Sequence, residues 1–169
     1  LGRCTTGVAA DWQGIRNALY WVEGNIADTY VGATAIDLAL MDVVHLTAGA
    51  QTTHGQRMAQ TVLDILGNET YHRGPSINYA SQINTTTVDV YLSHVSGTDF
   101  TPTSAITGFE ILDSGTPETI NTAVRQSASV IRLTIAGTIT GTLSVRYLYG
   151  ANPTITSPVF DNTAMTLPL

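Results

Sequence analysis

Asp42 and His45 form an acid–base pair three residues apart, at the start of the stretch DVVHLTAGA. A carboxylate beside an imidazole fixes which ring nitrogen carries the proton and stabilises the protonated ring, as the general base of a serine esterase requires. A tight turn would bring the Asp42 carboxylate to Nδ1 of His45, so we expect a hydrogen bond there, with Nε2 facing an open cleft. The structural alternative is that Asp42 only caps a turn and His45 packs partly buried.

A helix and a strand are expected before this pair. Asp11 is a candidate N-cap for a helix over Trp12–Glu23, and Gly24 is a candidate stop. One face of this helix carries apolar residues at helical spacing: Ile15, Ala18, Leu19 and Val22. The following run TYVGATAIDLAL (29–40) predicts a buried strand that ends near Leu38.

A second helix is expected after the pair. Thr53 with Gln56 three residues later matches a capping box, and Gly67 is placed to end the helix. His54 would then be an exposed first residue, and Arg57 would lie on the surface or pair with Asp64 or Asp42. The apolar residues at helical spacing are Met58, Val62, Leu63, Ile65 and Leu66.

A single strand in residues 1–70 cannot form a sheet, because its backbone groups would have no ladder partner. We therefore expect residues 1–70 to be the end of a larger α/β unit and not to fold independently. The chain begins with Leu1 and not with methionine, so we expect it to continue upstream.

Residues 71–169 predict a small all-β sandwich, after a boundary in the turn-rich segment 67–76. Short alternating runs are separated by Gly, Asn and Pro turns, which is typical of this architecture. The strongest runs are TTVDVYLS (86–93), SVIRLTIAG (129–137) and TLSVRYLYG (142–150), and the weaker ones are ITGFEILDSG (106–115) and ETINTAVR (118–125).

The composition excludes several classes of function. The chain is 43% hydrophobic and 12% charged, which favours a packed core over disorder. Its net charge is −6 and it has no run of basic residues, so nucleic acids and anionic membranes are poor partners. No apolar run approaches the ~20 residues of a membrane span. One cysteine, Cys4, and four scattered histidines predict neither an internal disulfide nor a metal site.

The stretch DLALMDVVHLTAGAQTTHGQRMAQ resembles the last catalytic block of the SGNH (GDSL-like) hydrolases, particularly the carbohydrate O-acetylesterases. In that family a strand leads into Asp-x-x-His, followed by a glycine and a helix that contains Gly-x-Arg-x-Ala. The upstream helix region, with Arg3 and Arg16, is also similar to these esterases. The positions that match the block are Asp42, His45, Gly49, Gly55, Arg57 and Ala59.

The resemblance implies that residues 1–70 are the C-terminal portion of a three-layer α/β/α domain and that residues 71–169 are an appended β-sandwich. It implies that the segments VRYLYGANP and DNTAMTLPL fold back towards the hydrolase domain. It also implies that His45 is the general base and that Asp42 orients it. The family's Gly-Asp-Ser nucleophile block and its oxyanion residues do not occur here, so we expect the nucleophile upstream and no activity in the isolated chain.

Joined to that segment, the chain would remove acetyl groups from a polysaccharide without a metal or organic cofactor. The expected partners are the upstream part of the hydrolase, an acetylated polysaccharide and, as an open alternative, further copies of the chain. Low charge and a Thr/Ser-rich β region suit a secreted or virion-surface protein such as a phage tail spike. The alternative function is a non-catalytic structural or glycan-binding module of a viral or secreted assembly.

Overall fold

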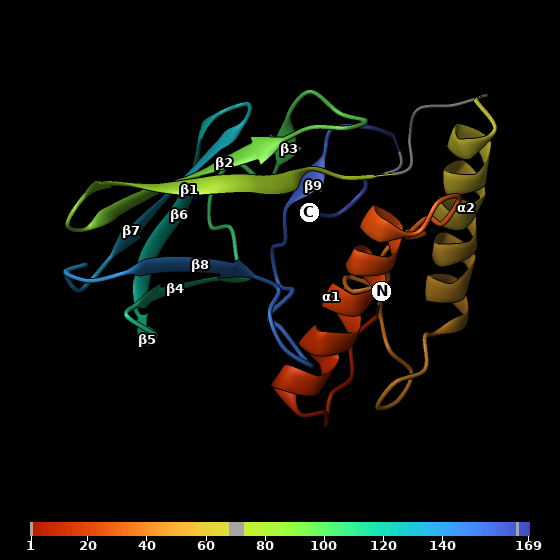
Figure 1. Ribbon diagram of the computed structural model, residues 1–169, viewed down its shortest axis with the longest axis horizontal. Coiled ribbons are helices and arrows are strands. Elements are labelled where there is room, and N and C mark those ends of the chain that lie inside the picture. The colour runs from red at the N-terminus through yellow and green to blue at the C-terminus, as the bar shows by residue number, and fades with distance from the viewer. Residues whose placement is uncertain (1, 68–72, 165) are drawn as a thin grey trace. The chain divides into compact units, whose positions relative to one another are not determined.

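The computed structural model describes residues 2–67, 73–164 and 166–169, and the chain divides into two units (Figure 1). Unit 1 comprises Leu1–His72 and Tyr149–Pro153, and unit 2 comprises Arg73–Leu148 and Thr154–Leu169. The described residues form two helices and nine strands in antiparallel sheets, so the protein is mixed and mostly β. Half of the boundary segment expected at 67–76 lies outside the described residues, because 68–72 are among those not described.

Helix α1 (Ala9–Asn25) begins three residues before the expected start and runs through Gly24. The prediction that Asp11 is the N-cap is wrong, because Val8 occupies that position and Asp11 lies in the first turn. Ala9 and Ala10 are strong helix formers, which extends the helix towards the N-terminus. Asp11 still suits its position, since a carboxylate near a helix N-terminus interacts favourably with the helix dipole.

Helix α2 (Ala48–Ile65) also begins earlier than expected. Its N-cap is Thr47, whose side-chain oxygen accepts a hydrogen bond from the backbone N–H of Ala50 at 3.2 Å. The capping box at Thr53 is therefore wrong, and Thr53 donates to the Gly49 carbonyl inside the helix at 3.2 Å. The end is predicted correctly: Gly67 has a positive φ of 75°, a conformation that glycine adopts without strain.

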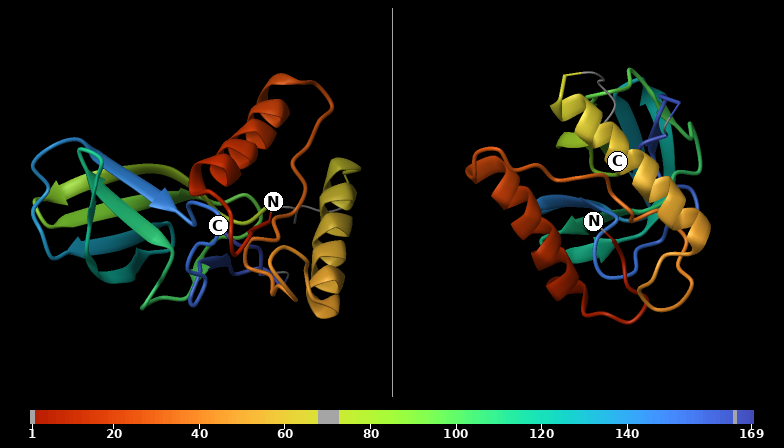
Figure 2. Two further views of the ribbon diagram at one scale, coloured as in Figure 1. Left: turned by 90° about the horizontal axis from the view of Figure 1, so that it is seen from below. Right: turned by 90° about the vertical axis from the view of Figure 1, so that its right-hand side faces the viewer.

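The strand expected over residues 29–40 is not formed. Only an isolated bridge pairs Leu40 with Leu46, and the described part of unit 1 offers no other strand to complete a ladder. Four apolar residues of the run, Ala33, Ala35, Ile36 and Leu38, are nevertheless buried, and Ala35 and Leu38 pack against Ala50 of α2. Figures 1 and 2 show α1 and α2 as separate rods joined by this irregular connection.

Unit 2 contains three antiparallel sheets, with strand orders β1-β2-β7-β6, β5-β4-β8 and β3-β9. The five predicted strands correspond to β2, β4, β6, β7 and β8. Strand β1 was not predicted, because its sequence SINYASQIN does not alternate apolar and polar residues. The bounds are β1 Ser76–Asn84, β2 Thr87–Ser93, β3 Phe100–Thr101, β4 Phe109–Asp113, β5 Thr116–Glu118, β6 Ile120–Ser127, β7 Val130–Ile135, β8 Leu143–Tyr147 and β9 Phe160–Asp161.

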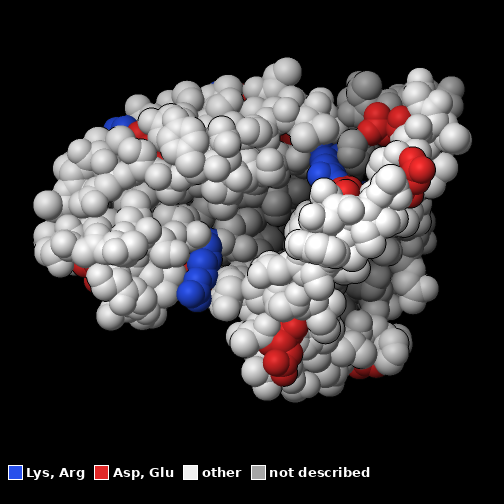
Figure 3. All heavy atoms as spheres, in the orientation of Figure 1, with Lys and Arg blue, Asp and Glu red and all other residues white. Residues whose placement is uncertain are grey.

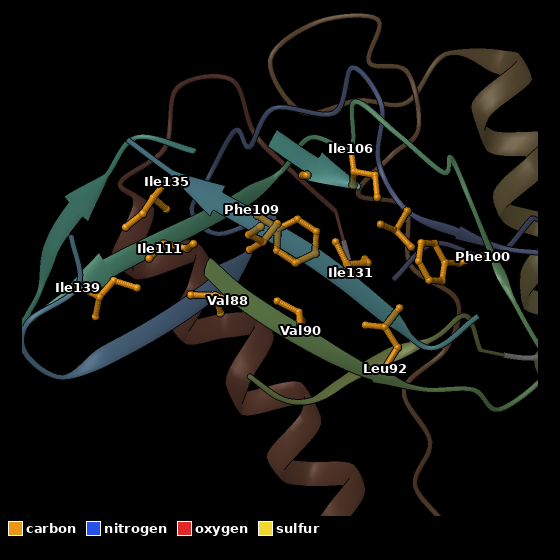
Figure 4. Close-up of a cluster of buried hydrophobic side chains, with 13 residues drawn as sticks. Val88, Val90, Leu92, Phe100, Ile106, Phe109, Ile111, Ile131, Ile135 and Ile139 are labelled. Carbon is orange, nitrogen blue, oxygen red and sulfur yellow. The ribbon is translucent and has the colours of Figure 1, made fainter. Parts of the chain in front are cut away.

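One hydrophobic core fills unit 2, and alternate residues of its strands enter it. Val88 and Val90 of β2, Ile131 of β7 and Ile111 of β4 are fully buried in this core (Figure 4). Because β4 belongs to a different sheet from β2 and β7, the two larger sheets share the core, an arrangement compatible with a β-sandwich. The hairpin between β4 and β5 turns through Ser114 and Gly115, both at positive φ, as a two-residue turn of this kind requires.

The segment after β8 returns to unit 1. The backbone N–H of Cys4 donates to the Ala151 carbonyl at 2.9 Å, and Arg16 Nη1 donates to the Gly150 carbonyl at 2.6 Å. The C-terminal segment instead belongs to unit 2, where an isolated bridge pairs Phe160 with Pro168. The segments VRYLYGANP and DNTAMTLPL are thus held in different surroundings.

Candidate functional site

A closed loop between residues 39 and 47 carries Asp42 and His45. The Leu40–Leu46 bridge closes it, the Met41 N–H donates to the His45 carbonyl at 2.8 Å, and the Thr47 N–H donates to the Ala39 carbonyl at 3.1 Å. Thr47, the last residue of the loop, is also the N-cap of α2, so the helix begins directly after the loop. The backbone therefore holds the loop at both ends.

Within this loop the Asp42 carboxylate contacts His45 twice. Asp42 Oδ2 lies 2.8 Å from His45 Nδ1, which confirms the expected geometry. Asp42 Oδ1 accepts hydrogen bonds from the backbone N–H groups of Val44 and His45, both at 2.9 Å. The carboxylate thus caps the turn and contacts the ring at the same time. Packing does not explain the ring's position, because the His45 side chain is 70% exposed and that of Asp42 is 47% exposed.

These bonds favour the ionised form of Asp42 and one tautomer of the neutral His45 ring. The backbone N–H groups of His45 and Val44, followed by the His45 ring, lower the pKa of Asp42 to about 2. At neutral pH this carboxylate can only accept, so Nδ1 of His45 carries the proton that it shares with Oδ2. In the neutral ring the lone pair then belongs to Nε2, which has no hydrogen-bond partner among the described residues. The pair can therefore accept a proton at Nε2, while the cleft expected in front of that atom stays a prediction.

Arg57 anchors α2 to the segment that precedes the loop. Its Nη1 and Nη2 donate to Oδ1 and Oδ2 of Asp37 at 2.8 and 2.9 Å, and Nη1 also approaches the Thr34 carbonyl at 3.3 Å. Both side chains of the ion pair are almost fully buried. The prediction that Arg57 lies on the surface or pairs with Asp64 or Asp42 is wrong, because the irregular run before the loop packs against α2 and brings Asp37 to it.

Two further arginines bind backbone carbonyls of unit 1. Arg16 is buried, and its Nη2 donates to the Gly2 carbonyl at 2.9 Å. Burial lowers the pKa of Arg16, since desolvation disfavours the charged form. Arg3 Nη2 donates to the Leu38 carbonyl at 3.3 Å, and Arg3 Nη1 donates to Asn152 at 3.1 Å. Arg3 and Arg16, which belong to the region of resemblance, thus bind irregular backbone segments of unit 1. Among the described residues, neither arginine forms a hydrogen bond with the His45 ring.

The remaining candidates have structural surroundings. His54 lies inside α2 and is not its first residue, and its Nε2 donates to the Ala33 carbonyl at 3.1 Å. His94 donates through Nε2 to the Ala128 carbonyl at 2.9 Å. Tyr147 accepts a hydrogen bond from the Val159 N–H at 2.6 Å and packs on Phe109, so it is a packing residue.

No serine lies near the Asp42–His45 pair in the sequence, because the first serine of the chain is Ser76 and the segment 149–153 has none. The one thiol, that of Cys4, is buried. Unit 1 therefore contains an imidazole bonded to a carboxylate, but neither a serine nor an exposed thiol among its residues. That another segment supplies a nucleophile stays a prediction.

Other kinds of site find little support in the described residues. They contain no group of three or more His, Cys, Asp or Glu side chains that could hold a metal ion. Neither helix within residues 2–67 has the length and hydropathy needed to cross a membrane. All seven basic side chains are arginines, and charged side chains are sparse on the face shown in Figure 3.

Comparison with protein-family models gives no match, and comparisons with curated proteins and with solved structures give none either. Any functional conclusion for this chain thus depends on its own residues and their geometry.

Proposed function

We propose that this chain is the C-terminal portion of a serine carbohydrate esterase of the SGNH type, in which His45 is the general base and Asp42 orients it. The observation that carries the proposal is the 2.8 Å contact between Asp42 Oδ2 and His45 Nδ1 in an exposed loop. A carboxylate at Nδ1 directs the free lone pair to Nε2 and stabilises the imidazolium that forms when Nε2 takes a proton. A serine from outside this sequence would give up that proton as it attacks an acetyl ester.

The surface of unit 1 supports the need for such a further segment. Helix α1 buries Arg16 and exposes Ile15 and Leu19, which lie on the apolar face recognised in its sequence. Helix α2 likewise buries Arg57, while the apolar residues near its C-terminal end are exposed to solvent. Contiguous exposed apolar residues are typical of a surface that another part of the protein covers. We propose that the covering part carries the nucleophile and the strands of an α/β/α domain.

In this function the substrate is an acetylated polysaccharide, and the reaction passes through an acyl-enzyme. The serine oxygen bonds to the acetyl carbon, the sugar oxygen leaves with the proton from His45, and water then releases acetate by the same two steps. Every proton transfer occurs at Nε2 of His45, while Nδ1 stays bonded to Asp42. The setting that fits is an extracellular enzyme or a virion-surface protein.

The experiment is a comparison of variants in the complete protein, assayed on a small acetyl ester and on acetylated polysaccharide. His45→Ala should lower kcat by roughly 10³-fold or more, as the loss of a triad base does. His54→Gln is the matched control, because it changes a histidine of the same unit that bonds only a carbonyl, and it should leave kcat within about twofold of the wild type. The 169-residue chain alone should be inactive.

Near-full activity of the complete His45→Ala protein would show that the base lies elsewhere. If the complete protein is inert on every acetylated glycan while it still binds them, the chain is a glycan-binding module and not part of an esterase.

A further inference from the structure

A stacked pair of tyrosines lies on the outer face of the four-stranded sheet of unit 2. The register places Tyr79 of β1 directly opposite Tyr91 of β2, and the ring centroids are 4.4 Å apart with the planes inclined by 13°. Val88 and Val90 of β2 enter the core, so Tyr91, odd-numbered like Asp89, points to the other side. Tyr79 is 51% exposed whereas Tyr91 is half-buried, so the pair presents an aromatic surface to solvent.

A two-point ion pair stands beside the tyrosines on the same face. Asp89 lies opposite Arg132 of β7, whose Nε and Nη2 donate to its two carboxylate oxygens at 2.8 and 2.7 Å. Arg132 is a diagonal neighbour of Tyr91, since Tyr91 pairs with Val130 two residues earlier on β7. Asp89 is almost buried and Arg132 is one-third exposed. Nε and Nη2 of Arg132 are occupied by Asp89, whereas Nη1 has no hydrogen-bond partner among the described residues. The N–H groups of Nη1 therefore remain available as donors.

This face carries no net charge. Asp89 and Arg132 neutralise each other, and the other residues that the register places on it are uncharged. They are Ser76, Ser81, Asn84, Thr87, Ser93, Thr122, Val124, Ser127, Val130 and Thr134. A nucleic acid would require unpaired cations, and a cationic ligand would require unpaired carboxylates. The chemistry that fits is a neutral ring with weakly polarised C–H bonds on one side and hydroxyl groups at its edge.

A pyranose has this chemistry. Its axial C–H bonds carry partial positive charge and pack on the negative face of an aromatic ring, and its hydroxyl oxygens accept from N–H donors. We propose that Tyr79, Tyr91 and Arg132 form a platform that binds neutral polysaccharide, with one sugar ring on Tyr79 and a hydroxyl of a neighbouring sugar unit on Nη1 of Arg132. This platform lies in unit 2 and requires no catalysis by His45. It therefore goes beyond the proposed function and can be tested independently of it.

The test is titration of the ¹⁵N-labelled 169-residue chain with hexasaccharides of neutral xylan, cellulose and chitin, with oligogalacturonate as the anionic comparison. We expect saturable amide shifts around Tyr79, Ser81, Tyr91 and Arg132 with at least one neutral probe. Tyr79→Leu keeps the apolar bulk but removes the aromatic face, and it should weaken binding by about threefold to tenfold. Tyr79→Phe should retain binding within about twofold, and Tyr30→Ala, which changes an exposed tyrosine of unit 1, should have no effect.

Arg132→Lys keeps the charge near Asp89 but removes the Nη1 donors, and it should also weaken binding while the far-UV circular dichroism is unchanged. The proposal is overturned if no neutral probe shifts these amides, if oligogalacturonate binds more tightly, or if Tyr79→Leu binds as well as the wild type. In the complete protein, His45→Ala should leave this binding unchanged, so a failure of the esterase proposal is recognised separately.

Discussion

Arg57 and Asp37 form a two-point ion pair in which both side chains are almost fully removed from water, 3% and 7% exposed. The pair joins the middle of α2 to the segment five residues before Asp42. Breaking a buried pair leaves one uncompensated charge, which costs much more than the loss of a surface pair.

Asp37→Asn should therefore lower the free energy of unfolding of unit 1 by about 3–5 kcal/mol. Both tryptophans, Trp12 and Trp21, lie in α1, so tryptophan fluorescence during urea unfolding follows this unit. The matched control is Asp99→Asn, which breaks a similar two-point pair with Arg125 that is about one-third exposed. Solvent screens that pair, and circular dichroism should show a loss of about 1 kcal/mol or less. Equal losses in the two variants would contradict the role of burial.

Thr47→Ala should destabilise α2 by about 1 kcal/mol, because the helix loses the side-chain acceptor for the Ala50 N–H. Thr53→Ala is the control at the position where the sequence alone predicts the cap. Thr53 lies inside the helix, where alanine has the higher helix propensity, so this change should be neutral or slightly stabilising. Urea unfolding of both variants distinguishes Thr47 from Thr53 as the N-cap of α2. A larger loss in the free energy of unfolding for Thr53→Ala than for Thr47→Ala would refute the observed helix start.

Asp42 should titrate near pH 2, which ¹³C NMR of its carboxyl carbon would measure. Its pKa in the folded protein lies below the value of about 3.9 for an unfolded chain, so the carboxylate stabilises the loop above about pH 4. That contribution should disappear as the pH falls from about 4 through about 2. The amide signals of Val44 and His45 should shift with the same midpoint, since both N–H groups donate to Oδ1. These hydrogen bonds do not form in solution if the Asp42 carboxyl titrates with a midpoint near pH 4. The same conclusion follows if the amide signals of Val44 and His45 do not shift as Asp42 titrates.

Ile15→Gln and Leu19→Gln should change the stability of the 169-residue chain by no more than about 0.5 kcal/mol, because both side chains are exposed. In the complete protein the same changes should cost about 2 kcal/mol or more each, if another segment buries this face. Ile131→Ala is the control: this fully buried core residue should cost about 2–5 kcal/mol in both forms. Unchanged stability of the two glutamine variants in the complete protein would mean that nothing covers the face.

The sequence by itself determined the elements with strong local signals. The alternation of apolar residues in β2 and β7 places their side chains alternately in the core and outside it, and this pattern requires no knowledge of neighbouring strands. Gly67 ends α2 as predicted, since glycine adopts a positive φ without strain. The contact between Asp42 and His45 was also predictable, because a turn of three residues brings the two side chains together without help from distant chain.

Only the tertiary structure decided which residues meet across long separations. The apolar run 29–40 has the composition of a strand, but a strand requires a ladder partner, and without one in the described part of unit 1 the run packs irregularly on α2. That packing buries Asp37 and gives Arg57 a partner twenty residues away, which no local pattern indicates. The pairing of Tyr79 with Tyr91 likewise depends on the register of β1, a strand without alternation. Local periodicity specifies which secondary structure a segment can adopt. Long-range pairing also depends on contacts that form only after the intervening chain has closed into a loop, at a cost in entropy.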